Sequence, residues 1–285
     1  RQYGITCMES GKYEDAVKAF QNALGESIGH IGEKELDICF YKAKAQALDG
    51  KTKDALATYN AIIKYNKDAR AYYLRGDLYM DMGEEKKGRA DFESAVQQGK
   101  KNYEIYIGIY ESLSRHEKKD EGQKYLSAAM EIKGDKPEDE LYKGRISYLL
   151  GENKDAISYL EKAKEHKQML ASYYLGLAYD ANGDSDKAKK CIAEYIKSGV
   201  ATSYDLYELG MQEMQDGNYK NALTYFNSGL ELEKVPNKQN LMKSAIAAYE
   251  YSGDFDSAKK MMKEYLKAYP DDEEAKHENT FLETR

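Results

Sequence analysis

The stretch ARAYYLRGDLYMDMGEEKKGRADFESAVQQGK, residues 69–100, contains the pattern that decides the fold. In its first half, Tyr72, Gly76 and Tyr79 recur at the spacing of one face of an α-helix. Gly83 follows, and glycine supplies the left-handed backbone conformation with which many helices end. A second apolar face with helical spacing then runs to the end of the stretch. This part of the sequence therefore predicts two helices joined by a tight turn.

The same unit repeats along the whole chain, because three columns of small residues recur with fixed offsets and a period near 34 residues. The first column comprises Gly4, Ala43, Gly76, Gly108, Gly144, Gly176 and Gly210. The second comprises Gly11, Gly50, Gly83, Gly151, Gly183, Gly217 and Gly253. The third comprises Ala16, Ala55, Gly88, Gly122, Ala156, Ala188, Ala222 and Ala258. Small residues in the first and third columns let two helices cross closely. Since one helix pair cannot bury both of its faces, stacked pairs are expected to form a continuous core.

The composition of the 285-residue chain favours an all-α protein. The chain contains 27 tyrosines and 10 methionines but only 4 valines and 3 prolines, and valine is a strand former. The net charge is −7 and no basic stripe is visible, which argues against a nucleic-acid partner. No stretch approaches about 18 consecutive apolar residues, so no membrane-spanning helix is expected.

No constellation of catalytic or metal-binding residues is visible in the sequence. Cys7, Cys39 and Cys191 lie far apart, and we expect them to be small buried residues rather than a disulfide or metal site. The four histidines lack partners at the spacing of a metal site or catalytic triad. The carboxylates alternate with lysines, as on solvated helix surfaces. We therefore expect no enzyme activity, no metal and no cofactor.

The repeat resembles the tetratricopeptide repeat family, whose unit has 34 residues. The sixth unit, QMLASYYLGLAYDANGDSDKAKKCIAEYIKSG, is similar through Gly176, Tyr179, Gly183 and Ala188. The resemblance implies an all-α superhelical solenoid of about eight helix–turn–helix repeats over residues 1–270, with a C-terminal capping helix at 271–285. The units are expected near residues 1–35, 36–68, 69–100, 101–136, 137–168, 169–202, 203–238 and 239–270.

Two segments depart from the repeat pattern. The glycine-rich residues 25–34 are an insertion between the first two units, and we expect them to form a surface loop. The fourth unit has Gly108 in the first column but no glycine at its turn. Residues 115–120 are therefore expected to contain about two extra residues at that turn.

The resemblance also implies a binding surface, because first helices of this family line the concave face of the superhelix and hold peptide ligands. Carried over to this sequence, the face comprises Arg70, Tyr73, Asp77, Met80, Leu141, Arg145, Tyr148, Tyr173, Leu177, Asp180, Tyr204, Tyr207, Met211 and Met214. Tyrosine and methionine offer large, adaptable contact area, and charges fix the register of a ligand. The alternative is that these side chains only pack between adjacent first helices. Because Tyr73, Asp77 and Leu177 stand where the family's groove for C-terminal carboxylates has other residue types, no such groove is expected.

The preferred hypothesis is a non-catalytic scaffold that binds a protein or peptide segment along the first helices of units three to seven. The alternative is a structural module that self-associates through its ends in an envelope or cytoplasmic complex, with apolar surface exposed around Ile5 and Met8. The sequence begins with Arg1 rather than Met. Localisation therefore stays open between the cytoplasm and, if a signal or lipoprotein segment precedes Arg1, the cell envelope.

Overall fold

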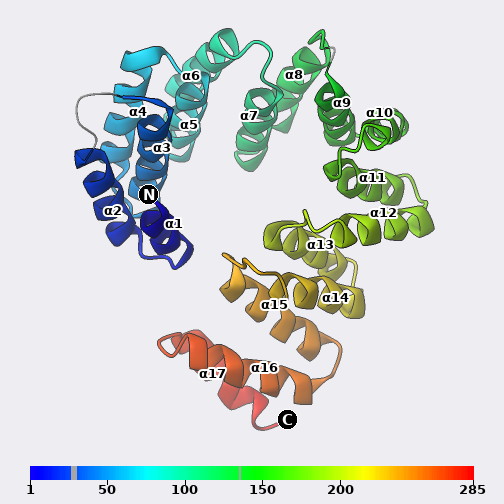
Figure 1. Cartoon of the computed structure of the whole chain (residues 1–285). Helices are drawn as coiled ribbons and strands as arrows, with labels where there is room; N and C mark the ends of the chain where they lie inside the picture. The colour runs from blue at the N-terminus through cyan, green and yellow to red at the C-terminus, as the bar shows by residue number, and fades with distance from the viewer. Residues whose placement is uncertain (27–30, 135) are drawn as a thin grey trace. The chain divides into compact units, whose positions relative to one another are not determined.

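A computed structural model describes residues 1–26, 31–134 and 136–285, which form 17 α-helices and no β-strand (Figure 1). The helices follow one another in pairs. The first helices are α1 (Gln2–Glu9), α3 (Glu33–Leu48), α5 (Ala69–Asp81), α7 (Tyr103–Arg115), α9 (Pro137–Leu150), α11 (Leu170–Ala181), α13 (Ser203–Gln215) and α15 (Lys238–Tyr251). The second helices are α2 (Tyr13–Gly25), α4 (Thr52–Asn66), α6 (Glu85–Gln98), α8 (Lys119–Met130), α10 (Asn153–Glu165), α12 (Ser185–Lys197), α14 (Tyr219–Leu230) and α16 (Phe255–Ala268), and α17 (Glu273–Leu282) follows the last pair. The predicted all-α helical-repeat solenoid is confirmed.

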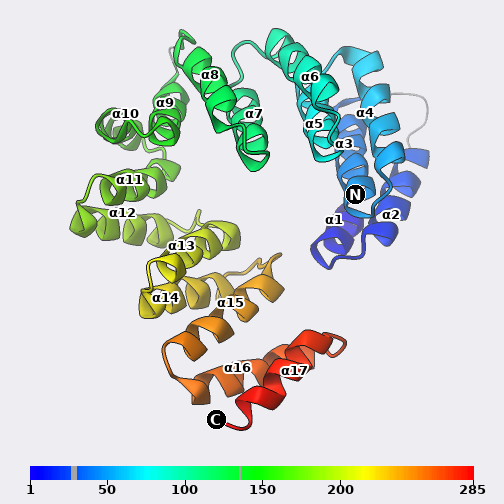
Figure 2. The same ribbon diagram turned by 180° about the vertical axis from the view of Figure 1, so that it is seen from behind.

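The helices divide into two compact units, Arg1–Lys197 with α1–α12 and Ser198–Arg285 with α13–α17. In the N-terminal unit, α5, α7 and α9 lie on the inner side of the stack, and α6, α8 and α10 lie on its outer side (Figures 1 and 2). Successive first helices also touch, as α5 does with α7 and α9 with α11. A first helix therefore packs both against its own partner and against the first helices of neighbouring pairs.

The turn inside each pair needs a residue in the left-handed conformation. Gly83 has a φ of +73°, and no heavy atom lies within 4 Å of the position that a Cβ would take there. In the turn between α7 and α8, Glu117 adopts this conformation instead, with a φ of 61°. Glu117 lies 34 residues after Gly83 and 34 before Gly151. The turn therefore keeps the period, and the two extra residues predicted within 115–120 do not exist.

Small residues in the first column let the two helices of a pair approach closely, as predicted. A Cβ added at Gly76 would lie 2.8 Å from the ring of Phe92 in α6, and one added at Gly176 would collide with Ile192 in α12. A larger side chain at either position would force the helix axes apart or displace the buried partner.

Gly108 does not belong to this column, contrary to the sequence prediction. A Cβ added there would lie 2.6 Å from the ring of Tyr73 in α5, rather than against α8. Tyr110 occupies the place that faces α8, since its ring lies 3.1 Å from a Cβ added at Gly122. Tyr110 also stands 34 residues after Gly76. The column therefore follows the period and not the nearest glycine, and the register of α7 is two residues later than predicted.

The core lies between paired helices and between neighbouring pairs, with Phe20, Phe92 and Phe226 fully buried. Cys7 and Cys191 are buried and Cys39 is partly buried, and none forms a disulfide. The burial of Cys7 and Cys191 agrees with the expectation, whereas Cys39 is less enclosed than predicted. Of the loop expected at residues 25–34, residues 27–30 lie outside the described part of the chain.

Candidate functional site

The site residues predicted on α5 lie in different environments. Arg70 is exposed, and its guanidinium carbon lies 4.3 Å from the centre of the Phe40 ring. Tyr73 is partly buried between α5 and α7, and this burial raises the pKa of its hydroxyl. Met80 is only 2% exposed and packs against α6. Met80 therefore belongs to the core rather than to a surface that a ligand could reach.

An ion network joins the first helices α5, α7 and α9. Arg115 of α7 donates to the Asp77 carboxylate of α5, with 2.6 Å between nitrogen and oxygen. Arg145 of α9 donates to Glu111 at 2.9 Å and to Glu104 at 3.4 Å. These five side chains, Asp77, Glu104, Glu111, Arg115 and Arg145, are called the first-helix ion network below. Because the network links successive repeats, it fixes charges at defined places along their shared face.

Arg145 makes two of the three ion pairs in the first-helix ion network, those with Glu104 and Glu111. Its side chain is 18% exposed, and its guanidinium carbon lies 5.5 Å from the centre of the Tyr174 ring in α11. Two carboxylates and an aromatic face therefore surround one guanidinium, and both kinds of contact stabilise its charge. The network thereby holds one of the predicted binding residues in a fixed position.

The sequence prediction misses Glu104, Glu111 and Arg115. The predicted set contains no residue of α7, whose register was aligned on Gly108. One period of 34 residues after Arg70 leads to Glu104, and the same step after Asp77 leads to Glu111. The repeat period itself was therefore the signal that could have found both carboxylates.

The residues predicted on α9 and α11 divide into core and surface. Leu141 and Tyr173 are buried, and the Tyr173 ring lies 5.2 Å from that of Tyr195 in α12. Both side chains therefore belong to the core. Tyr148 is partly buried, and this burial raises the pKa of its hydroxyl, with the charge of Asp180 acting in the same direction.

Leu177 and Asp180 keep part of their surface free. Leu177 is partly buried on α11, whereas Asp180 is exposed near the end of that helix. The Asp180 carboxylate accepts a hydrogen bond from the Ser185 hydroxyl at 3.3 Å. A carboxylate has several lone pairs, so Asp180 can accept further bonds from a ligand.

The site residues predicted in the C-terminal unit lie on α13. Tyr204 is 57% exposed. Tyr207 is partly buried, with its ring centre 6.2 Å from that of Phe226 in α14. The sulfur of Met211 lies 3.6 Å from the Ser244 hydroxyl, which donates to it, and Met214 packs partly buried against the core of α14 and α15. Tyr204 therefore offers the largest free ring of this group.

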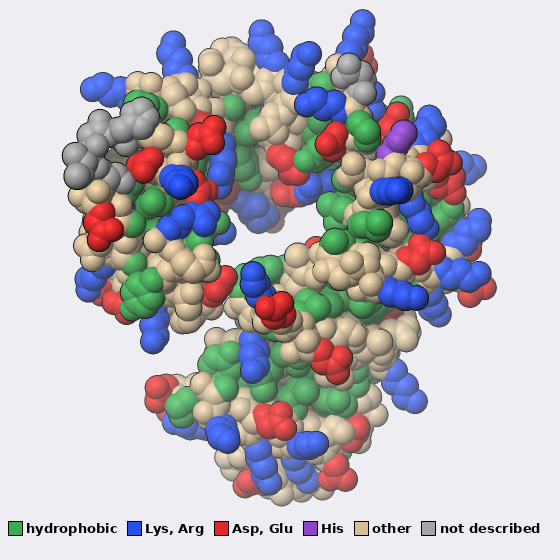
Figure 3. All heavy atoms as spheres, viewed as in Figure 1, with side chains coloured by type: hydrophobic (Ala, Val, Ile, Leu, Met, Phe, Trp, Pro, Cys, Tyr) green, Lys and Arg blue, Asp and Glu red, His purple; other side chains and the backbone are tan. Residues whose placement is uncertain are grey.

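The visible surface of both units carries charged side chains of both signs. In the N-terminal unit, lysine and arginine side chains project along the outer edge of the stack (Figure 3). Over the C-terminal unit, hydrophobic side chains lie among acidic and basic ones (Figure 3).

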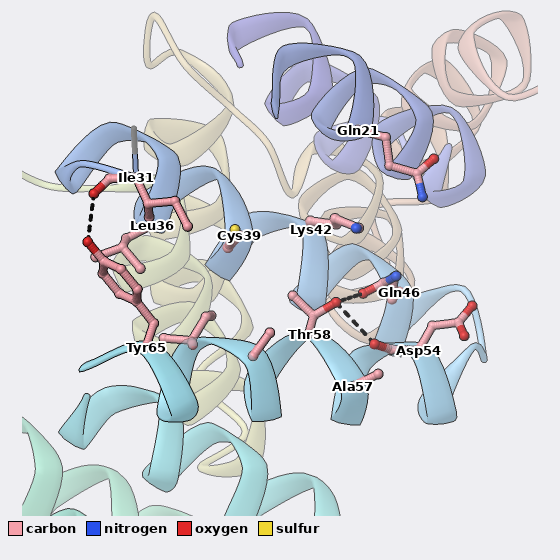
Figure 4. A pocket seen from close by; sticks show the side chains of 12 residues that line it. Gln21, Ile31, Leu36, Cys39, Lys42, Gln46, Asp54, Ala57, Thr58 and Tyr65 are labelled. Carbon is pink, nitrogen blue, oxygen red and sulfur yellow. Dashed lines mark hydrogen bonds between the residues drawn. The ribbon is translucent and has the colours of Figure 1, made fainter. Parts of the chain in front are cut away.

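A pocket of about 510 Å³ lies between α2, α3 and α4 (Figure 4). Its walls include Leu36, Cys39 and Ile62. The Thr58 hydroxyl donates to the Gln46 side-chain oxygen at 2.8 Å, so polar groups in the wall pair with each other. Burial raises the pKa of the Cys39 thiol, and a thiol that stays protonated is a weak nucleophile. The pattern of a single repeat does not predict this pocket, because helices from two repeats form it together.

Among residues 1–26, 31–134 and 136–285, no three histidine, cysteine, aspartate or glutamate side chains are grouped so that they could hold a metal ion. Over those ranges, no helix combines the length and the apolar character that crossing a bilayer requires.

Two tetratricopeptide repeat family models match the chain, one over residues 5–64 and 42–103 and the other over residues 170–198 and 239–272. No curated protein matches it. The chain is similar to a tetratricopeptide repeat protein from Parabacteroides merdae, at 12% identity and a TM-score of 0.51 over 87% of this chain and 96% of that one.

Two further crystal structures are more distant. The chain is similar to PilW, a widely conserved type IV pilus biogenesis factor, at 18% identity and a TM-score of 0.48 over 73% of this chain and 97% of that one. The C-terminal part of a repeat protein from Cytophaga hutchinsonii has 14% identity and a TM-score of 0.41, over 85% and 98% of the two chains. The Parabacteroides likeness supports the fold alone, and the two family models together cover more than half of the sequence. The chain therefore belongs to the tetratricopeptide repeat family.

Proposed function

We propose that the chain is a non-catalytic scaffold that binds a protein or peptide segment through the exposed face of its first helices. Protein binding is typical of tetratricopeptide repeats. The observation that supports the proposal is the first-helix ion network, because its charges lie on three successive first helices, α5, α7 and α9, while Glu104 and Arg115 stay about half exposed. A peptide backbone or polar side chain could pair with these groups without breaking the network.

The reachable part of the predicted face is smaller than the full set. In the N-terminal unit it comprises Arg70, Tyr73, Asp77, Arg145, Tyr148, Leu177 and Asp180. In the C-terminal unit it comprises Tyr204, Tyr207, Met211 and Met214. Each set combines apolar area with hydrogen-bonding groups, which is the mixture that peptide recognition requires.

Affinity capture with matched variants tests the scaffold function. The wild-type protein, Asp180→Ala and Tyr204→Ala are used to capture partners, which mass spectrometry identifies. Both altered residues are exposed, so both variants should fold. We expect each variant to lose part or all of the wild-type partner set. Tyr251→Ala is the control, since Tyr251 is 68% exposed and was not predicted to bind. Unchanged capture by both variants would argue against this face.

Self-association through α1 is the second candidate function. Tyr3 is 70% exposed on this helix, and Ile5 and Met8 are only partly buried. An apolar patch of this kind is typical of an interaction surface. Multi-angle light scattering over a range of concentrations tests the idea, with Tyr3→Lys as the matched variant. A monomer at every concentration would exclude self-association under those conditions.

A further inference from the structure

The C-terminal unit contains a pocket of about 290 Å³ between α15, α16 and α17. Its deepest surface is apolar, because Ile246 and Met262 are buried and Ala275 closes the side at α17. Its volume is at the lower end of the range for ligand pockets, about 300–1,000 Å³. The pocket therefore fits one long side chain better than a complete small-molecule ligand. Its charged lining residues are Lys243, Glu250, Glu274 and Glu278.

The one lysine in this lining is already paired. The Lys243 ammonium lies 2.8 Å from Asp272 and 3.5 Å from Glu274. Asp272 also accepts a hydrogen bond from the Tyr265 hydroxyl at 2.5 Å. The hydrogen bond with Lys243 lowers the pKa of Asp272, so this carboxylate stays ionised beside the lysine. The positive charge of Lys243 is therefore directed toward Asp272 and Glu274.

The part of the lining formed by Glu250 of α15 and Glu278 of α17 has excess negative charge. One carboxylate oxygen of Glu250, Oε1, is shielded from solvent and has no hydrogen-bond partner among the described residues. Burial raises the pKa of Glu250, and the charge of Glu278 on α17 acts in the same direction. Since a shielded acceptor without a donor costs free energy, a cation placed between Glu250 and Glu278 would stabilise both carboxylates.

We propose that this pocket binds a lysine side chain of a partner protein or peptide. The methylene groups would lie on Ile246 and Met262, and the ammonium would pair with Glu250 and Glu278. Charge complementarity and the depth of the apolar floor favour a lysine over a neutral or acidic side chain. The inference rests on the scaffold function proposed above and adds to it the chemistry of one side chain of the partner.

Nuclear magnetic resonance of the full chain with ¹³C-methyl methionine tests the proposal, because the Met262 methyl group reports on the pocket floor. The probe is Nα-acetyl-lysine amide, and its neutral counterpart is Nα-acetyl-norleucine amide. We expect the lysine probe to shift the Met262 signal with a Kd of about 1–10 mM, and the norleucine probe to bind at least about tenfold more weakly. The Met214 signal should not move, since this residue does not line the pocket.

Two variants separate the pocket charge from general charge effects. Glu250→Gln with Glu278→Gln should weaken lysine binding by about tenfold or more. Glu264→Gln makes a charge change on the exposed surface of α16 and should leave binding unchanged. Equal shifts of Met262 with both probes, or no shift with the lysine probe, would overturn the proposal. Equal loss of binding in Glu264→Gln would overturn it as well.

The result is independent of the partner-capture experiment. If the lysine probe fails while Asp180→Ala and Tyr204→Ala lose partners, the scaffold function stands and only the lysine pocket is wrong. If the probe binds while capture is unchanged in those two variants, the pocket stands and the first-helix face is wrong.

Discussion

At the scale of single residues, Arg145 shows how one side chain can link several repeats. Its guanidinium binds Glu104 and Glu111 and lies beside the ring of Tyr174. We expect Arg145→Met to lower the free energy of unfolding by about 1–2 kcal/mol, because it leaves two carboxylates without their cation. The estimate lies below that for a fully buried pair, since both glutamates are about half exposed.

Urea unfolding at low and high salt measures this loss. The difference between wild type and Arg145→Met should shrink at high salt, because screening weakens partly exposed ion pairs. Arg70→Met is the matched control, and we expect it to change the free energy of unfolding by less than about 0.5 kcal/mol. A difference that salt does not change would assign Arg145 a packing role instead.

Substitution of Glu250 is expected to stabilise the protein, in contrast to substitution of Arg145. Burial raises its pKa above the ordinary value of 4.5, so the folded state favours the protonated acid. The stability that this preference supplies is present below pH 4.5 and is lost as the pH rises through the folded-state pKa. At pH 7 the charged carboxylate is therefore unfavourable, and Glu250→Gln should raise the Tm.

Thermal unfolding at two pH values checks the sign. The gain in Tm from Glu250→Gln should be largest near about pH 7 and should fall at about pH 4, where the wild-type acid is protonated. Glu264→Gln should not show this dependence. If the Glu250 carboxylate instead stabilised the fold, Glu250→Gln would lower the Tm. A lower Tm at about pH 7 would therefore contradict the inference that the charged carboxylate is unfavourable in the pocket.

At the scale of elements, the turn between α7 and α8 contains a strained backbone conformation at Glu117, whose removal is expected to stabilise the protein. Glu117 is exposed and has a φ of 61°, where the other pairs have glycine at the equivalent position. Glu117→Gly should raise the free energy of unfolding by about 0.5–1 kcal/mol, since it removes the strain of an L side chain but adds freedom to the unfolded chain. Denaturant unfolding measures the change.

The turn at Gly83 provides the reciprocal control. Gly83→Ala places a Cβ in the left-handed conformation without any new contact, because that position is open. We expect it to lower the free energy of unfolding by about 1 kcal/mol. If Glu117→Gly were destabilising, contacts of the Glu117 side chain would have to outweigh its backbone strain.

The contacts that hold α17 in place predict how the thermal stability of the protein changes at low pH. Asp272 precedes this helix, accepts from the backbone nitrogen of Ala275 and pairs with Lys243. Its pKa is lowered from 3.8, chiefly by the hydrogen bond with Lys243. A lowered acid pKa supplies stability above the unfolded value, and that stability is lost as the pH falls through the folded-state value. Asp272→Asn should therefore lower the Tm at about pH 7, and the difference should shrink below about pH 3.

Thermal unfolding of Asp272→Asn across this pH range measures the effect. Asp271→Asn is the control, because Asp271 is the exposed neighbour and makes no comparable contacts with Lys243. Equal behaviour of the two variants would show that the charge of Asp272 does not hold α17 in place.

The sequence was sufficient for the helix pairs but not for the rotation of each helix. Pairs could be predicted because small residues and turn glycines recur with one period, and sterics at Gly76 give that pattern its cause. The rotation of α7 could not be predicted from the position of a glycine alone. Gly108 allows α7 to pack closely against Tyr73 of α5, whereas Tyr110 is the residue that faces α8. The predicted face contains no residue of α7, and the corrected register places Glu104 and Glu111 one period after Arg70 and Asp77.

Burial decided which predicted site residues reach the surface. Met80, Leu141 and Tyr173 lie on first helices as expected, but contacts with neighbouring helices cover them. Tyrosine occurs 27 times in this chain and serves both core and surface, so its identity does not distinguish the two. The pocket beside Glu250 depends on three helices of the C-terminal unit, and a repeat pattern read one unit at a time does not contain it.

At the scale of the whole molecule, the repeat architecture implies that stability is local. Helices pack against partners that are near in sequence, as α13 does with α14 and α15 and as α5 does with α6 and α7. In such a chain, the free energy of unfolding is approximately a sum over repeats and the interfaces between neighbours. A core defect in one repeat should therefore act mainly on that repeat and those beside it.

Phe226→Ala tests this locality, because Phe226 is fully buried in α14 and its ring packs against Gly210 of α13. We expect a local loss of about 3–5 kcal/mol. Hydrogen exchange followed by mass spectrometry should show faster exchange in α13–α15, whereas α5–α8 should exchange as in the wild type. Phe92→Ala in α6 is the reciprocal variant and should affect α5–α7 instead. Uniformly faster exchange in both variants would mean that the chain unfolds as one cooperative body, and the additive description of its repeats would then be wrong.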